Sequence, residues 1–403
     1  MSFQQGLSGL NAAGKNLDAI GNNVSNAATV GYKGSNTVFS DVFAGAAYGV
    51  ANNAIGIGTQ LTDVAQNFGQ GTLSISTNPL DIAINGRGLF RMNASGTISY
   101  SRNGQFQLDR NGYVVNAQGT RLTGYAVNSA GQIVPSAPVD LQISSADIAP
   151  VTTSTASIVM NLDSSSAVLA ALPAFDQTNT ATFSSATSLT VYDSLGNSHS
   201  QALYFRKTAA GTYATYSSLD GAAAVSIGTL TFNSSGVLQA PTSLASSLVL
   251  TNGAATPQAV TVSFANSTQY GSPFAVSSLS QNGNASGRLT GFTIGQDGTI
   301  LGRYSNGLTR AQGQIVLANF TNLQGLQQLG NSSWAETSDS GQPLVGAPNT
   351  GSMGILQSGA LEESNVDMTA ELVSMITAQR VYQANAQSIK TQDQVLQTLV
   401  NLR

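Results

Sequence analysis

The residue types that most often carry catalysis are scarce in this chain. Its 403 residues include one histidine and no cysteine. A Ser-His-Asp triad would have to use that histidine, His199. It ends the segment 193–199, whose Asp, Ser, Gly and Asn residues are typical of a turn between two strands. Serine is abundant along the whole chain, so closeness in sequence identifies no triad, and we expect His199 to lie in a surface turn without a catalytic role.

Metal and cofactor sites have equally little support. The absence of cysteine removes disulfides and thiolate ligands and leaves the redox compartment open. The segment 109–112 lacks the third ligand position and the closing Glu of a calcium loop, and so indicates a turn. Gly56-Ile57-Gly58 lacks the third glycine and the following helix of a dinucleotide-binding loop. A carboxylate pair for glycoside hydrolysis remains open, but we expect no metal, no cofactor and no enzyme.

Composition favours assembly over catalysis. Only 8% of the residues are charged, against about 25% in a typical soluble domain. A net charge of −4 offers no basic patch for phosphates, so we do not expect nucleic acid as a partner. The sequence contains no run of 18 apolar residues that would indicate a membrane span. Residues 1–5 lack the basic and apolar regions of a secretory signal. We expect no membrane insertion, and any export would not use a cleaved signal peptide.

The C-terminal segment from Asn365 is expected to form one long helix. Asp367 and Glu371 fall near its start, which suits the helix dipole. A helix of about 50 Å with polar residues in its seam is marginal in water without a partner. From Met368 its seam repeats at intervals of four and three residues, with no Gly or Pro: Leu372, Met375, Gln379, Tyr382, Ala386, Ile389, Asp393, Leu396 and Val400.

The N-terminal segment offers such a partner, because it repeats the same spacing up to about Asn26. Gly14 and Gly21 in this repeat would permit close backbone approach. Each helix could simply pack on its own globular body. Matching heptads favour instead a coiled coil, both within a subunit and between subunits. The predicted assembly residues are Phe3, Leu7, Leu10, Leu17, Ile20, Val24, Leu372, Met375, Tyr382, Ile389, Leu396 and Val400.

Between the helices the sequence predicts β structure. Residues 31–71 are rich in Gly, Asn and Ala and are interpreted as an extended connector with room for one hairpin. From Thr72 the apolar period changes to two, as in strands. Asn103-Gly104 lies between alternating segments at 98–100 and 106–108, which predicts a hairpin. Asn111-Gly112 predicts another turn.

An internal similarity suggests that one β domain interrupts another. The pattern Arg-Leu-Thr-Gly begins at Arg121 and again at Arg288, with similar residues at the same offsets afterwards. The predicted fold is therefore mainly β and multidomain, with nested antiparallel β domains, a sandwich or barrel as the insertion, and coiled-coil helices at both termini. The expected divisions are a helical domain (1–30 and 360–403), the connector (31–71), a first β domain (72–144 and 288–359) and an inserted outer β domain (145–287).

Two motifs resemble the bacterial flagellar axial proteins, the family that builds the rod and the hook. The run 16–26 with 29–33 resembles their N-terminal signature, and 361–367 with 379–386 resembles their C-terminal signature. Ser25 and Tyr32 stand where Ala and Phe are frequent in that family. The motif positions carried over to this chain are Asn22, Asn23, Asn26, Gly31, Tyr32, Lys33, Asn365, Val366 and Asp367.

Within that family, the run 389–394 and the size of the insertion look most like hook members. The resemblance implies a subunit of an extracellular, curved tubular polymer that joins rod to filament as a universal joint. It also implies export through the flagellar type III apparatus, and contacts with itself and with rod, hook cap and hook–filament junction proteins. Two alternatives stay open: a distal rod subunit, which should form a straight tube, and a secreted β-rich adhesin, which should not polymerise.

Overall fold

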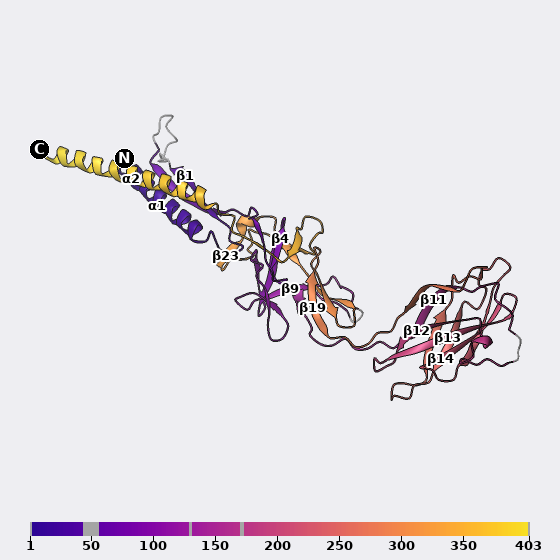
Figure 1. The fold of residues 1–403 in the computed structure, drawn as a ribbon. Coiled ribbons are helices and arrows are strands. Elements are labelled where there is room, and N and C mark those ends of the chain that lie inside the picture. The colour runs from indigo at the N-terminus through magenta and orange to yellow at the C-terminus, as the bar shows by residue number, and fades with distance from the viewer. Residues whose placement is uncertain (1, 43–55, 129–130, 170–172, 402–403) are drawn as a thin grey trace. The chain divides into compact units, whose positions relative to one another are not determined.

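The computed structural model describes residues 2–42, 56–128, 131–169 and 173–401. The fold is mainly β with one long helix near each terminus, as predicted (Figure 1). The chain divides into two compact units. Unit 1 comprises Met1–Ser144, Gly291–Arg303 and Thr309–Arg403, and unit 2 comprises Ser145–Thr290 and Tyr304–Leu308. The described part of the chain contains no helix that is both long and apolar enough to cross a membrane.

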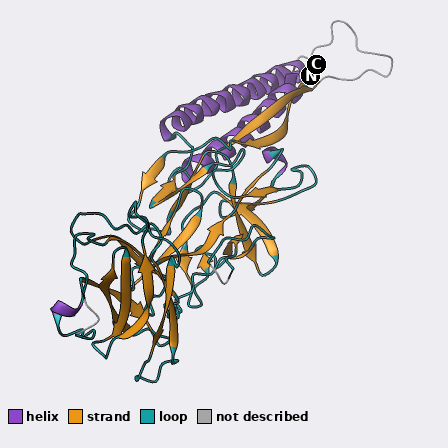
Figure 2. Ribbon diagram, turned by 90° about the vertical axis from the view of Figure 1, so that its right-hand side faces the viewer, coloured by secondary structure: helices purple, strands orange, loops and turns teal. Residues whose placement is uncertain are grey.

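The two long helices lie side by side in unit 1 (Figures 1 and 2). They are α1 (Ser2–Ser25) and α2 (Met368–Asn401). Asp367 caps α2, because its Oδ1 accepts hydrogen bonds from the backbone N–H groups of Thr369 (2.8 Å) and Ala370 (3.1 Å). The pairing is antiparallel, since Gly6 of α1 meets Ile389 of α2 whereas Asn23 bonds to Glu371.

The predicted connector contains an antiparallel ladder formed by β1 (Ser35–Val42) and β2 (Gly58–Gln66), with a bulge between Val38 and Phe39. The ladder packs against α1. Thr37 Oγ1 donates to Asn16 Oδ1 at 2.9 Å, which ties β1 to the helix. These strands therefore support α1 directly.

The core of unit 1 is a 13-stranded sheet with the main order β19-β20-β21-β9-β5-β6-β24-β23. Trp334 and Tyr100 are buried in its apolar cluster. Short ladders β3 (Leu73–Ile75) with β27 (Ala360–Glu362) and β4 (Ile82–Asn85) with β26 (Ile355–Ser358) lead to α2. The sheet strands are β5 (Leu89–Ala94), β6 (Thr97–Ser101), β7 (Gln107–Leu108), β8 (Val114–Val115), β9 (Arg121–Tyr125), β10 (Val139–Asp140), β19 (Leu289–Ile294), β20 (Thr299–Tyr304), β21 (Thr309–Ile315), β22 (Leu317–Asn319), β23 (Gln327–Gly330), β24 (Ser333–Ala335) and β25 (Leu344–Gly346), with a 3-10 turn η2 (Leu323–Gly325).

Two predictions for this sheet have different outcomes. Both Arg-Leu-Thr-Gly segments contribute strands, β9 and β19, to the same sheet. The hairpin predicted at Asn103-Gly104 is wrong, because β6 pairs with β5 and β24 while β7 pairs with β8. The chain leaves the sheet there instead, and the Gly104 carbonyl accepts a hydrogen bond from Ile82 N at 2.9 Å. The turn predicted at Asn111-Gly112 does join β7 to β8.

Unit 2 is a sandwich of two four-stranded sheets that share one apolar core. Alternate residues of several strands face that core, such as Leu203 and Phe205 from one sheet and Val260 and Val262 from the other. One pair of strands departs from the antiparallel prediction, since β11 and β17 run parallel. A parallel pair needs a long crossover connection, and the strands of the other sheet lie between β11 and β17 in the sequence and provide it. The sheets are β16 (Ser243–Leu248), β17 (Gln258–Ser263), β11 (Thr155–Asn161), β18 (Ala275–Gln281), and β12 (Ser185–Tyr192), β13 (Ser198–Ala209), β14 (Thr212–Leu219), β15 (Val225–Thr231), with a 3-10 turn η1 (Thr180–Thr182).

Candidate functional site

The face that α1 turns toward α2 is built from residues at heptad spacing, two of which are small. Gly6, Ala13 and Ile20 are buried there. A Cβ atom added to Gly6 would lie 3.0 Å from the Ile389 side chain, and one added to Gly9 would lie 2.9 Å from that of Asn385. These glycines therefore set the close approach of the helices. Within one copy, the prediction that Gly14 and Gly21 do so is wrong, because nothing lies within 4 Å of a Cβ at either position.

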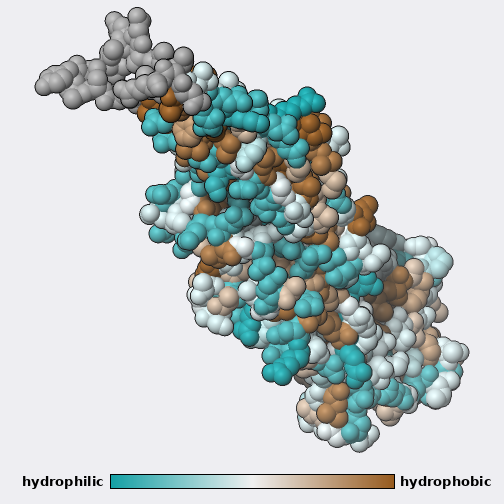
Figure 3. Space-filling view, turned by 90° about the vertical axis from the view of Figure 1, so that its left-hand side faces the viewer, coloured by the Kyte–Doolittle hydropathy of each residue, from teal (hydrophilic) through white to brown (hydrophobic). Residues whose placement is uncertain are grey.

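The predicted assembly residues divide by exposure. Ile20 is buried between the helices. Leu10, Leu17, Val24, Met375 and Ile389 are half-buried. The exposed ones are Phe3 (46%), Leu7 (45%), Leu372 (45%), Tyr382 (39%), Leu396 (53%) and Val400 (74%). In Figure 3, apolar side chains interrupt the polar surface over the helical part at the top of the view. Large apolar side chains left uncovered together mark contact surfaces, so a single copy satisfies only part of the apolar stripe.

A buried ionic cluster lies where both helices join the β structure. Glu362, just before α2, has a fully buried carboxylate. Its Oε1 accepts hydrogen bonds from Lys33 Nζ at 2.5 Å and from Gly71 N at 2.9 Å. Arg102 Nε lies 3.3 Å from Glu362 Oε2 as an ion pair without a hydrogen bond. Lys33, Glu362 and Arg102 therefore join the segment after α1, the segment before α2 and the sheet; we call them the junction cluster.

Burial controls the charges of the junction cluster. Desolvation lowers the pKa of Lys33, and the neighbouring Glu362 carboxylate opposes that effect. Desolvation also lowers the pKa of Arg102, again opposed by Glu362. Further acceptors hold both cations: the Gly69 carbonyl lies 2.7 Å from Lys33 Nζ, and the Gly86 carbonyl lies 2.7 Å from Arg102 Nη2. Glu362 is the one carboxylate in the cluster, so its charge is needed by both partners.

The N-terminal motif residues surround this cluster. Asn23 Oδ1 accepts from Ser35 N at 2.9 Å, and its Nδ2 donates to Glu371 Oε1 of α2 at 3.0 Å. The Tyr32 hydroxyl donates to Asn23 Oδ1 at 3.2 Å and accepts from Asn22 Nδ2 at 3.1 Å. Asn26 Nδ2 donates to the Asn22 carbonyl at 2.9 Å, closing the last turn of the helix. These bonds fix the direction in which the chain leaves α1.

Gly31 and the C-terminal motif complete the junction. Gly31 adopts φ +69°, and a Cβ there would lie 2.6 Å from Asn103 N, so only glycine fits. Its N–H donates to the Glu362 carbonyl at 2.8 Å. Asn365 Oδ1 accepts from Gly34 N at 2.9 Å, and Val366 packs beside that same glycine. Asp367 then caps α2, so the motif positions form one structural joint.

Sequence reasoning missed Arg102 and the role of Glu362. Glu362 lies inside the C-terminal signature, but its partners Lys33 and Arg102 are far away in the chain. Arg102, moreover, belongs to neither motif. A buried cation gives no periodic signal in the sequence. The one available signal was the low content of charged residues, which suggests that each charged residue has a specific structural or functional role.

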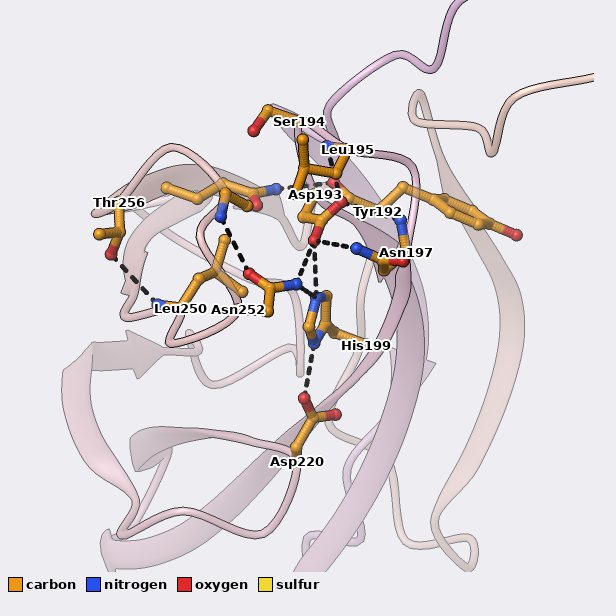
Figure 4. A network of polar contacts seen from close by, with 12 residues as sticks. Tyr192, Asp193, Ser194, Leu195, Asn197, His199, Asp220, Leu250, Asn252 and Thr256 are labelled. Atoms are coloured by element: carbon orange, nitrogen blue, oxygen red, sulfur yellow. Dashed lines mark hydrogen bonds and ion pairs between the residues drawn. The ribbon is translucent and has the colours of Figure 1, made fainter.

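The chain's histidine lies in a polar network of unit 2 (Figure 4). The prediction of a surface turn is wrong, because His199 is part of strand β13 and its side chain is only 13% exposed. Its Nδ1 lies 2.6 Å from Asp220 Oδ2, and its Nε2 lies 3.2 Å from Asp193 Oδ2. Asn252 Nδ2 donates to the same Asp193 oxygen at 2.5 Å. The strand extends further back than the turn composition suggested, which brings the imidazole between two carboxylates.

This network binds three loops of unit 2 together, those of Asp193, Asp220 and Asn252. Burial alone would raise the pKa of Asp193, but hydrogen bonds from Asn197, Asn252 and His199 lower it well below its ordinary value. Among the described residues, the imidazole contacts the carboxylates of Asp193 and Asp220 and the side-chain amide of Asn252, and no serine hydroxyl is bonded to it. In the described ranges, no three His, Cys, Asp or Glu side chains are placed to hold a metal ion.

We expect the network to make unit 2 more stable in mildly acidic than in alkaline solution, whereas strong acid removes the stabilisation again, because the pKa values of Asp193 and Asp220 are lowered in the folded state. The bond to Asp220 raises the pKa of His199, burial opposes this, and Asp193 adds to the rise. The stabilisation is therefore complete below the unfolded value of about 6.5 and is lost as pH rises through the higher folded pKa. Hydrogen exchange in Ser198–Ala209, corrected for intrinsic rates, should report a loss of about 1.5 kcal/mol, the low end for a charged hydrogen bond, because Asp220 is 51% exposed. Asp220→Asn should flatten this dependence, and a slope unchanged in that variant would contradict the assignment.

Comparison with known proteins gives matches along both units. The matching family models are "Flagella basal body rod protein" (residues 3–33), "Flagellar hook protein FlgE/F/G D1 domain" (83–158), "Flagellar basal body protein FlaE D2 domain" (161–284) and "Flagellar basal body rod FlgEFG protein C-terminal" (357–402). The matches thus include both helices as well as the β structure of each unit.

Full-length relatives carry the same description. The flagellar hook protein FlgE of Escherichia coli strain K12 is 42% identical, and the alignment covers 100% of both chains. FlgE of Salmonella typhimurium strain LT2 is also 42% identical over 100% of both chains. The crystal structure of Helicobacter pylori flagellar hook protein FlgE2 matches in fold with a TM-score of 0.53 at 14% identity, covering 72% of this chain and 100% of that one. From the full-length identity, this chain belongs to the flagellar hook protein family.

Proposed function

We propose that this chain is the structural subunit of the flagellar hook, a curved tubular polymer that transmits torque from rod to filament. The observation that carries the proposal is the apolar stripe of α1 and α2, which remains exposed in a single copy and includes Leu7, Leu372 and Leu396. Each such side chain stabilises an interface by about 1.5–3 kcal/mol when it is fully buried. Repetition in every subunit makes the helices the cohesive layer of a tube.

The proposed layers follow the chain's order. The helical segments 1–30 and 360–403 would form the inner tube, with 31–71 leading outward. The first β domain (72–144 and 288–359) would form the middle shell, and the insertion 145–287 the outer surface. A surface poor in charge and rich in Ser, Thr and Gly allows weak, hydrated contacts that can slide as the tube bends. The family motif residues, joined by the junction cluster, would hold the inner helices to the middle shell.

The same proposal sets the partners and location. The principal partner is the chain itself as a helical homopolymer, with rod, hook cap and hook–filament junction proteins at the ends and along assembly. The location is extracellular, on the bacterial flagellum, reached through the type III export apparatus. The protein is not an enzyme and needs no cofactor; His199 serves unit 2 as a structural residue.

Electron microscopy of purified chain tests the function. Under assembly conditions, such as high concentrations of ammonium sulfate, which strengthen apolar burial, we expect curved hollow tubes. Straight tubes would favour the distal rod alternative. A chain that stays monomeric across concentrations, with both units folded by circular dichroism, would contradict the polymer and favour the adhesin.

A further inference from the structure

The end of α2 is not covered by any of the residues that the structure describes. The antiparallel pairing places Ile389 opposite Gly6, so the helix continues past the start of α1. The described side chains of 393–398 and 400 are exposed, and Leu396 lies two heptads beyond Tyr382 on the face that meets α1. We call residues 392–400 the overhang. Its large apolar members include Val395, Leu396 and Val400, which are 49%, 53% and 74% exposed.

The same helices form an apolar groove elsewhere on the molecule. A cavity of about 480 Å³ opens between α1, α2 and the β1–β2 ladder. No charged side chain lines it, and its polar lining residues are Asn16, Thr59, Ser374, Thr377 and Asn385. Phe39, Val373 and Val381 are 36%, 60% and 48% exposed at this groove. The lining includes Ala12, Ala13, Phe39, Val373, Ala378 and Val381.

Charge at the two surfaces is complementary. Arg380, next to Val381, is exposed and forms no ion pair among the described residues. Asp393 of the overhang is exposed as well, and its described hydrogen bond comes from the neutral Gln397 at 2.9 Å. Apart from Asp393 the overhang is uncharged. A segment whose one charged group is a carboxylate therefore suits an uncharged groove with one arginine beside it.

We propose that the groove receives the overhang of a second copy of this chain, with Leu396 near Ala378 and Val381 and Asp393 near Arg380. This rests on the proposed function and specifies which surfaces join. The chain's own overhang cannot reach, because positions 381 and 396 lie on one rigid helix about 22 Å apart. Since the donor and acceptor surfaces differ, each added copy presents a free surface, and the contact propagates as an open polymer.

Disulfide trapping tests the proposal cleanly because the chain has no cysteine. In the double variant Val381→Cys with Leu396→Cys, an internal disulfide is impossible, since its Cα atoms must lie within about 7 Å. Oxidation under assembly conditions should give a ladder of dimers, trimers and larger species on a non-reducing gel. On the same gel, each single-cysteine variant should run as a monomer. In a matched control, Val381→Cys with Thr398→Cys, the second cysteine lies about 200° around the helix from position 396, and we expect at least tenfold less product.

The outcomes separate this inference from the proposed function. Tubes seen by microscopy without a ladder, or with an equal ladder in the control, would overturn the groove assignment and leave the function standing. Dimers alone in the double variant would indicate reciprocal exchange and overturn the open contact. Failure of the unsubstituted chain to form tubes would count against the function itself.

Discussion

Leu396→Asp should abolish polymerisation while leaving both units folded. The side chain is 53% exposed and lies beyond the α1 contact, so a single copy tolerates a carboxylate there. In the polymer, a buried unpaired carboxylate costs several kcal/mol. At about 1.4 kcal/mol for each factor of ten, the critical concentration for assembly should rise at least 100-fold. Sedimentation over a concentration series measures it, and circular dichroism reports the fold.

Thr398→Asp is the matched control for this change. It adds the same charge two residues away on the opposite side of α2, at a position that is also exposed. We expect its critical concentration to stay within a few-fold of the unsubstituted chain. Equal defects in the two variants would mean that charge near the chain end, rather than the seam, blocks assembly.

The helices could be predicted from the sequence because a heptad is a local pattern. Their packing could not. The contact side of α1 uses Gly6, Gly9 and Ala13, which have no large side chain to mark them, while the visible stripe of Phe3 and Leu7 stays exposed. An apolar pattern identifies what must be buried, but not whether the partner is the same chain or a second copy.

The β structure shows the same division between local and distant information. Alternation identified strands, whereas Asn103-Gly104 failed because the flanking strands prefer other neighbours, and partner choice is tertiary. His199 was misplaced because a turn composition before it hid the start of a long strand. The junction cluster was invisible for a related reason, since an isolated charge reveals neither its burial nor its partner.

That cluster should make Glu362→Gln the most destabilising conservative change in unit 1. The substitution keeps the size and one acceptor for Gly71 N, but leaves the buried Lys33 ammonium and Arg102 guanidinium without their carboxylate. Breaking a buried pair on one side costs about 3–5 kcal/mol. Because Glu362 holds segments from both ends of the chain, hydrogen exchange should accelerate together in 28–35 and 360–371. Denaturant unfolding measures the total loss.

Two further variants decide whether charge is the cause. Asp140→Asn breaks the ion pair between Asp140, which is 20% exposed, and Arg121, which is 41% exposed. It should lower the free energy of unfolding by at most about 1 kcal/mol. Adding Lys33→Met to Glu362→Gln removes the unpaired ammonium. The double variant should therefore lose about 0.5–3 kcal/mol less unfolding free energy than the two single variants lose together. Simple additivity would show that the two side chains act independently. The junction would then depend on the hydrogen bonds of the Gly31 N–H and of Asn365 Oδ1, which all these variants keep.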